Sequence, residues 1–169
     1  MRITITKRSA EEQLLVERAD GSRAQFRIPR KGPVPHDAVH FHAERALGLQ
    51  RGFWGSVAAG EDPQAIQARA MAGGHASAKR AGPPSDDIVE LLQAERLVEC
   101  FEAEMWGGAA DDAGIAAMAE AGWRASHVPP LALPPAALAA AREGLAAFGA
   151  EWQALPDGGS ATLEWQERE

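Results

Sequence analysis

Alternation of apolar and polar residues marks the first thirty positions of the chain as β structure. Residues 2–7 alternate, and two further strand-like runs, residues 14–18 and 24–28, flank an Asp20-Gly21 pair. An Asp-Gly pair between two such runs is the strongest short-range signal for a β-hairpin. The alternation leaves one face of the predicted sheet apolar, so another part of the chain has to cover that face.

The pattern changes at residues 29–35, where three prolines remove backbone donors and end strand pairing. Beyond them, apolar residues recur at helical spacing, and prolines at positions 35, 63 and 135 mark three helix starts. The helix at 85–106 has a broad apolar face, and we expect it to lie on the sheet. The predicted helices are residues 36–47, 63–72 with a continuation toward 80, 85–106, 111–121 and 135–154.

The end of the chain alternates again, from residue 161 to residue 167. A strand there needs a partner, and the predicted sheet at the N-terminus is the one within reach. We therefore predict an α+β fold in which a small antiparallel sheet packs against about five helices. It forms a single domain over residues 1–169, with a β-hairpin region (1–30), a helical region (36–154) and a C-terminal strand (161–167) that returns to the sheet.

Composition narrows the function classes. The 169 residues are 46% hydrophobic and 24% charged, which is typical of a globular protein. With a net charge of −7, the chain lacks the excess of basic residues that binds nucleic acids and anionic membranes, so we expect neither as a partner. The single Cys100 excludes an intramolecular disulfide and a cysteine-based zinc ribbon. No secretory signal opens the chain, and arginine greatly outnumbers lysine, so a bacterial, cytoplasmic protein is expected.

Three histidines within seven residues are the most suggestive feature for chemistry. On a helix, His36, His40 and Glu44 are successive i, i+4 neighbours, so their side chains can converge on one cation. The His-Asp-x-x-His string resembles the His-Glu-x-x-His helix of zinc metallopeptidases, with Asp37 in place of the glutamate base. We predict a divalent-metal site, zinc first, with His36, His40, Glu44 and His75 as ligands and Asp37 as the catalytic base.

This site can be structural or hydrolytic, and the sequence leaves open whether the protein is an enzyme. If it is one, the site implies a metal-dependent hydrolase. The alternative interpretation needs no metal. Asp37 then complements the positive end of the helix, His40 is a hydrogen-bonded histidine at the edge of the core, and Glu44 is a surface charge.

Two further patterns extend these alternatives. Residues 48–60 are rich in glycine and carry Phe53 and Trp54, which could line a pocket or contact a partner, or else fill the base of the core. This loop supports a second hypothesis, a non-enzymatic interaction module that binds another protein or a second copy of the chain.

Three glutamates on the helix at 85–106 could complete the metal site, although charges at helical spacing are usually a solvated face; they are Glu95, Glu99 and Glu102.

The stretch Pro35-His36-Asp37-Ala38-Val39-His40-Phe41, followed by Gly52-Phe53-Trp54-Gly55, resembles a family of small uncharacterised bacterial proteins. In that family a Pro-His-Asp-x-x-His helix start precedes a loop rich in glycine and aromatic residues. The resemblance covers residues 33–60. It implies that these residues form one unit, and it implies no particular activity.

Overall fold

A four-stranded antiparallel sheet forms one side of the molecule. The computed structural model describes residues 1–72, 82–108 and 110–166. The strands are β1 (Arg2–Lys7), β2 (Glu11–Glu17), β3 (Arg23–Pro29) and β4 (Ser160–Glu164), in the order β3-β2-β1-β4. The predicted hairpin joins β2 to β3, and Gly21 in its turn adopts a φ of 82°. The C-terminal strand pairs with β1, so the predicted α+β architecture is confirmed.

The second strand begins three residues earlier than its pattern indicated, because its first inward position is not apolar. Glu12 points to the covered face of the sheet and is only 1% exposed. Burial there raises the pKa of Glu12 to about 7.

The helices follow the predicted order, with one addition. In the described residues they are α1 (His36–Leu47), α2 (Phe53–Ala58), α3 (Pro63–Ala72), the 3₁₀ turn η1 (Asp86–Ile88), α4 (Val89–Gly107), α5 (Asp112–Ala125) and α6 (Pro135–Ala154). The prediction of a loop over residues 48–60 is wrong, because residues 53–58 form α2. The suggested continuation of the second helix toward residue 80 lies outside the described residues. None of the described helices combines the length and the apolar character that crossing a bilayer requires.

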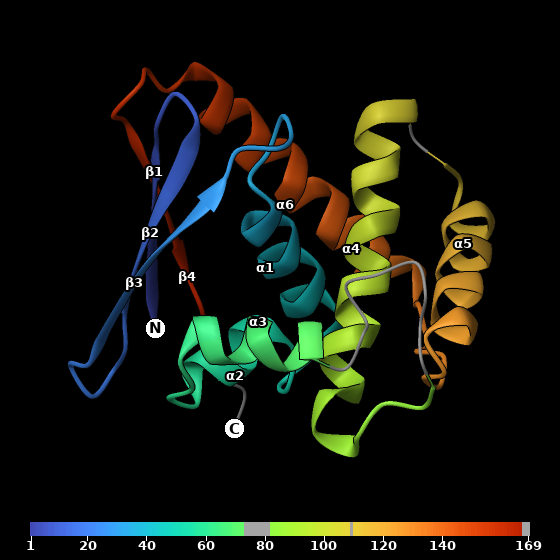
Figure 1. Cartoon of the computed structure of the whole chain (residues 1–169). Helices are drawn as coiled ribbons and strands as arrows, with labels where there is room; N and C mark the ends of the chain where they lie inside the picture. The colour runs from blue at the N-terminus through green and yellow to red at the C-terminus, as the bar shows by residue number, and fades with distance from the viewer. Residues whose placement is uncertain (73–81, 109, 167–169) are drawn as a thin grey trace.

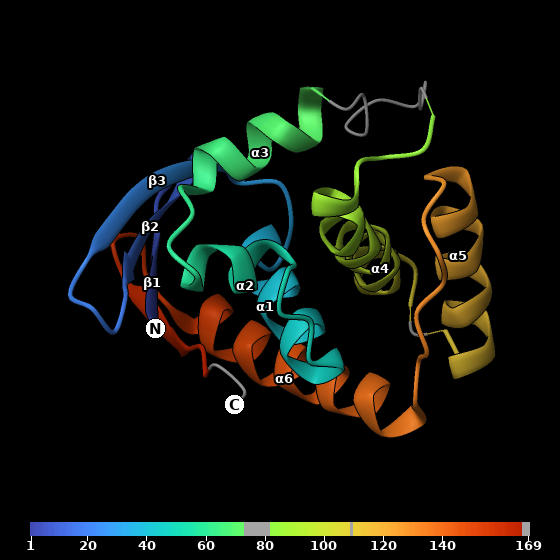
Figure 2. The same cartoon turned by 90° about the horizontal axis from the view of Figure 1, so that it is seen from below.

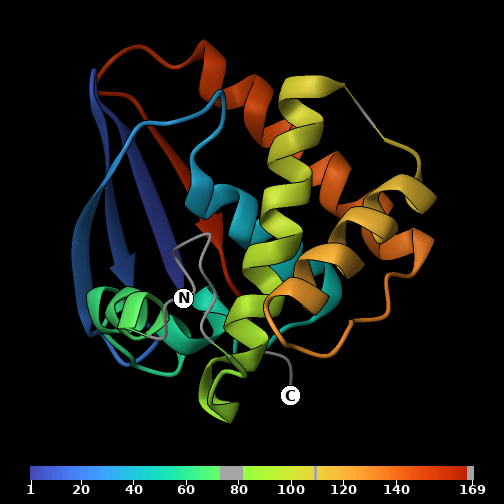
Figure 3. The same cartoon turned by 45° about the vertical axis from the view of Figure 1, so that its right-hand side comes forward.

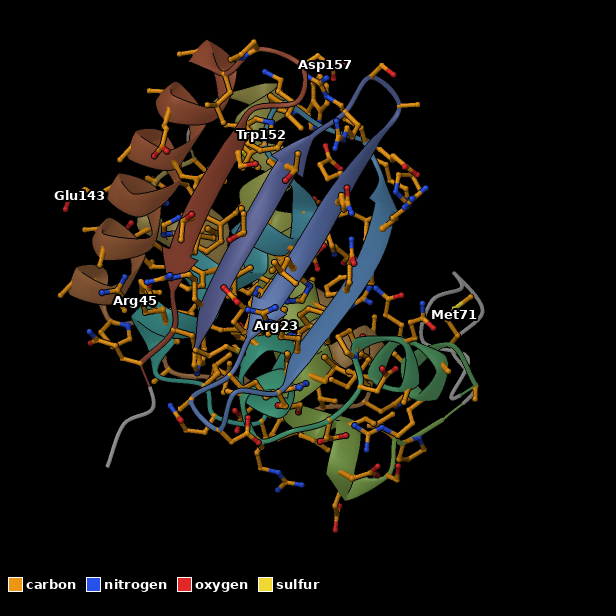
Figure 4. All side chains as sticks on the ribbon, turned by 90° about the vertical axis from the view of Figure 1, so that its left-hand side faces the viewer. Arg23, Arg45, Met71, Glu143, Trp152 and Asp157 are labelled. Carbon is orange, nitrogen blue, oxygen red and sulfur yellow. The ribbon has the colours of Figure 1, made fainter. Side chains whose placement is uncertain are left out.

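The elements are stacked outward from the sheet, as Figures 1 and 2 show. Helix α1 lies between the sheet and α4, α6 runs beside α1 from the sheet toward α5, and α5 lies on the far side of α4. Our expectation that α4 lies on the sheet is therefore wrong. The helix α1 takes that inner position because it is apolar on several sides, with Ala38, Val39, Phe41 and Ala43 all at most 1% exposed. The other face of the sheet is turned outward (Figure 4).

A buried lysine fastens α6 to the sheet. The ammonium group of Lys7, on the inner face of β1, donates to the carbonyl oxygens of Trp152 and Leu155, both at 2.9 Å. It also lies 5.6 Å from the centre of the Trp152 ring. These carbonyls belong to the C-terminal end of α6, where backbone acceptors lack helical partners and a cation is favourable. The label of Trp152 in Figure 4 marks this end of the helix beside β4.

We expect Lys7→Met to lower the free energy of unfolding by about 2 kcal/mol, because two largely buried carbonyls lose their donor while the aliphatic volume is retained. Urea denaturation measures this change. The control is Lys31→Met at an exposed position, which should shift stability by less than about 0.5 kcal/mol. Equal effects of the two substitutions would contradict a capping role for Lys7.

Candidate metal centre

The two histidines of the His-Asp-x-x-His string share one face at the start of α1. His36 is the first residue of the helix, after Pro35, and His40 follows one turn later. Their ring centroids are 4.8 Å apart, with the planes at 73°. The His40 side chain is 4% exposed and that of His36 is 37% exposed. The pair therefore reaches from the core to solvent.

Helix α4 brings a glutamate to this pair. Oε2 of Glu95 lies 3.0 Å from Nε2 of His40 and 3.8 Å from Nε2 of His36. One ligand atom from each of His36, His40 and Glu95 falls within 4.8 Å of the other two. Figure 3 shows α4 crossing in front of α1, which is the contact that places Glu95 opposite the histidines. These three residues could hold a metal ion.

Each histidine is held from behind by a second carboxylate. Nδ1 of His36 lies 2.8 Å from Oε1 of Glu102, and Nδ1 of His40 lies 2.9 Å from Oε1 of Glu44. A carboxylate at Nδ1 fixes that nitrogen as a donor and leaves Nε2 for a metal, the arrangement that orients histidine ligands in metalloproteins. Both Nε2 atoms face Glu95. Glu95 therefore lies on the Nε2 side of both rings, whereas Glu102 and Glu44 each lie on the Nδ1 side of one ring.

Glu44, on the Nδ1 side of His40, also anchors α2. Besides His40, its carboxylate accepts hydrogen bonds from the backbone N–H groups of Phe53 and Trp54, both at 2.9 Å. A Cβ at position 52 would lie 2.6 Å from Cδ of Glu44, so any side chain there would displace this carboxylate from its hydrogen bonds. Glu44 is fully buried and is not one of the three residues whose ligand atoms converge. The predicted ligand role of Glu44 stays a prediction.

Asp37 is enclosed beside this cluster. It is 3% exposed, and burial raises its pKa. Its Oδ2 has no hydrogen-bond partner among the described residues, while its backbone carbonyl accepts from Nε1 of Trp54 at 2.7 Å. The role of Asp37 as a catalytic base also stays a prediction. His75, the remaining predicted ligand, lies outside the described residues.

The aromatic pair predicted for a pocket or a partner surface is buried. Phe53 is 4% exposed and Trp54 is fully buried. The amides of both residues instead form the first turn of α2 against Glu44, and Phe53 packs on Phe26 of the sheet and on His40. The rings fill the base of the core, which was the alternative interpretation.

The interpretation of the α4 glutamates as a solvated face is wrong for two of them. Glu95 and Glu102 contact the histidines, whereas Glu99 is 47% exposed and pairs with Arg96. The spacings of four and three residues put all three glutamates on one side of α4, with Glu95 and Glu102, seven residues apart, closest to one line. Spacing alone therefore does not separate the two that contact the histidines from Glu99, and the packing of α4 on α1 makes that distinction.

Without a metal, the cluster is a network of ion pairs. Burial opposes protonation of both rings, but hydrogen bonds to Glu102 and Glu95 raise the pKa of His36 to about 9. Hydrogen bonds to Glu44 and Glu95 raise the pKa of His40 to about 10 against the same opposition. Although burial acts the other way, the two histidines hold the pKa of Glu95 well below its usual value. The carboxylates thus favour positive charge at this point, as protons or as a metal cation.

Comparison with known proteins found no matching family model, no similar curated protein and no similar solved structure. The resemblance of residues 33–60 to a bacterial family therefore stays a prediction.

Proposed function

We propose that the protein binds one divalent metal ion, zinc in the first instance, through Nε2 of His36, Nε2 of His40 and a carboxylate oxygen of Glu95. The convergence of these three ligand atoms within 4.8 Å is the observation that supports it. Zinc bonds of about 2.0–2.2 Å to nitrogen and oxygen place tetrahedral ligands roughly 3.4 Å apart. The distances of 3.0 and 3.8 Å from Glu95 to the histidines lie on either side of that value.

The donor set favours a hydrolytic site over a structural one. Structural zinc sites have four protein ligands, whereas catalytic sites have three and leave a position for water. The side chains of His36 and Glu95 are 37% and 32% exposed, so solvent reaches this cluster. A zinc ion held by His36, His40 and Glu95 would activate water as a nucleophile for hydrolysis at neutral pH.

The residues around the triad have separate tasks in this proposal. Glu102 and Glu44 hold the Nδ1 protons and so fix both rings in the tautomer that presents Nε2. Phe53 covers the inner side of His40 and excludes water there. Helix α4 supplies both Glu95 and Glu102, so the orientation of α4 against α1 sets the geometry of the whole site.

The test is metal content by mass spectrometry on protein purified without an affinity tag, compared with the variant His36→Ala/His40→Ala. We expect close to one equivalent of zinc in the parent, and an affinity loss of about 100-fold or more in the variant, because two of three ligands are gone. Glu102→Gln, which retains the ligands, should weaken binding by about tenfold.

The control is His127→Asn, which removes an exposed histidine on the C-terminal side of α5 and should leave zinc binding unchanged. A parent protein that contains no metal and takes up none on titration would overturn the proposal. The cluster would then be an ion-pair network that joins α1 to α4.

A further inference from the structure

The candidate metal centre contains more negative charge than a divalent ion neutralises. Glu95 is one of the three proposed ligands, and Glu102 and Glu44 contact the two histidines at 2.8 and 2.9 Å. With neutral histidines, one divalent cation and three carboxylates leave a net charge of −1. Within the described parts of the chain, the ion pairs of these three carboxylates are with His36 and His40, and none is with a lysine or arginine.

The surroundings do little to reverse this sign. The start of α1 contributes the partial positive charge of a helix N-terminus, about half an elementary charge. Asp37 lies in that same first turn and offsets it when ionised. Arg96, which follows Glu95 in the sequence, lies against Gly122 of α5 and pairs with Glu99. Because His40 and Glu44 are buried, the charges in this cluster are screened less than charges on the surface.

We propose that the open metal position discriminates by charge, accepting neutral or cationic ligands and disfavouring anions. This inference rests on the proposed metal site and specifies its substrate class. The substrate of the proposed hydrolase is then an uncharged or cationic carbonyl compound, such as an ester or amide, whose oxygen approaches the cation. Phosphate esters and free carboxylates are disfavoured, because sites for such anions supply arginine, lysine or unengaged backbone N–H groups to receive them.

The backbone donors nearest to the cluster support this reading. The first N–H groups of α2, which elsewhere would be free to bind an anion, already donate to the carboxylate of Glu44. Glu44 therefore occupies the place that a phosphate oxygen would take at the start of that helix. The Glu44 carboxylate is thus a fixed anion on the buried side of the metal position. It would repel a second anion that enters from solvent.

The experiment uses protein loaded with Co²⁺, whose visible absorption reports changes at the open position. Azide serves as the anionic probe and imidazole as the neutral one, and each is titrated into the parent and into Glu102→Gln. The glutamine keeps an acceptor for Nδ1 of His36 and removes one negative charge. We expect azide to bind about three- to tenfold more tightly to Glu102→Gln than to the parent, with imidazole affinity changed less than twofold.

Glu120→Gln on α5 is the matched control, because it removes an exposed carboxylate that pairs with Arg124, away from the cluster. It should leave both affinities unchanged. If cobalt does not bind the parent, the proposed metal site fails and this inference fails with it. If cobalt binds but azide affinity is the same in the parent and in Glu102→Gln, charge selection is overturned while the metal site stands.

Discussion

Replacing Glu44 by alanine is expected to lower the free energy of unfolding by about 3–5 kcal/mol. The carboxylate is fully buried and accepts hydrogen bonds from Nδ1 of His40 and from the N–H groups of Phe53 and Trp54. Alanine leaves all three donors without a partner in the core. It also leaves the buried His40 beside Glu95 alone, which weakens the attraction that keeps that ring charged.

Urea denaturation of the metal-free protein measures this loss. Glu44→Gln keeps one acceptor oxygen and should destabilise by roughly half as much. The control is Glu143→Ala on α6, whose side chain points away from the molecule in Figure 4 and should cost less than about 0.5 kcal/mol. A loss in Glu44→Ala no larger than the loss in Glu143→Ala would contradict the anchoring of α2 by this residue.

The metal-free protein is expected to lose stability as the pH rises from 7 to 9. The pKa of a free histidine is 6.5, whereas folding raises the pKa of His36 to about 9 and that of His40 to about 10. The stabilisation by protonated histidines is complete below pH 6.5 and disappears as the pH rises through the values of the folded state. With allowance for solvent screening at the partly exposed His36, the loss by pH 9 is on the order of 3 kcal/mol.

Three other groups with large pKa shifts titrate outside this window. Burial raises the pKa of Glu12 to about 7 and lowers that of His42 to about 4, so both act mainly below pH 7. Burial raises the pKa of Cys100 from 9.0 to about 11, so this thiol acts above pH 9. The carboxylates around the two histidines are Asp37, Glu44, Glu95 and Glu102. Burial also raises the pKa of Asp37, which lowers stability in the same direction as the pH rises, so a variant without the histidines is needed to assign the slope.

Chemical denaturation at several pH values, with and without zinc, measures the effect. Zinc takes the place of the protons, so the zinc-saturated protein should show little slope above pH 7 and the stabilisation by zinc should grow with pH. His36→Gln/His40→Gln should remove most of the slope in the metal-free protein. A stability of the metal-free parent that is constant or rising from pH 7 to 9 would contradict the raised pKa values.

Local patterns were sufficient for most of the fold. Alternation identified the strands because one face of the sheet is buried and the other is wet, and proline and glycine marked the helix ends. Local patterns did not predict helix α2, because its stabilisation comes from outside the helix. Its first amides are capped by Glu44, nine residues before α2 begins, and α2 has no capping side chain next to its own start. A helix stabilised by a distant side chain leaves no signal in its own sequence.

Only the part of the candidate site that lies on one helix, α1, could be predicted from the sequence. The i, i+4 spacing of His36 and His40 put both rings on one face, as observed. The third member, Glu95, is 55 residues beyond His40 and reaches it through the packing of α4 on α1. The same spacing made Glu44 look like a ligand, whereas its carboxylate lies on the Nδ1 side of His40. Helical spacing brings side chains together, but it does not say which ring nitrogen each will face.

The pairing of β1 with β4 has a consequence for how the chain acquires its structure. The ammonium group of Met1 donates to the carbonyl oxygen of Trp165 at 2.9 Å, across a sequence separation of 164 residues. Contacts of such high order close a very long loop, and folds that depend on them form more slowly than folds built from local contacts. During synthesis β1 emerges before all the helices, and its partner β4 is made only after them. Until then an inner strand of the final sheet is an open edge, to which other chains can add.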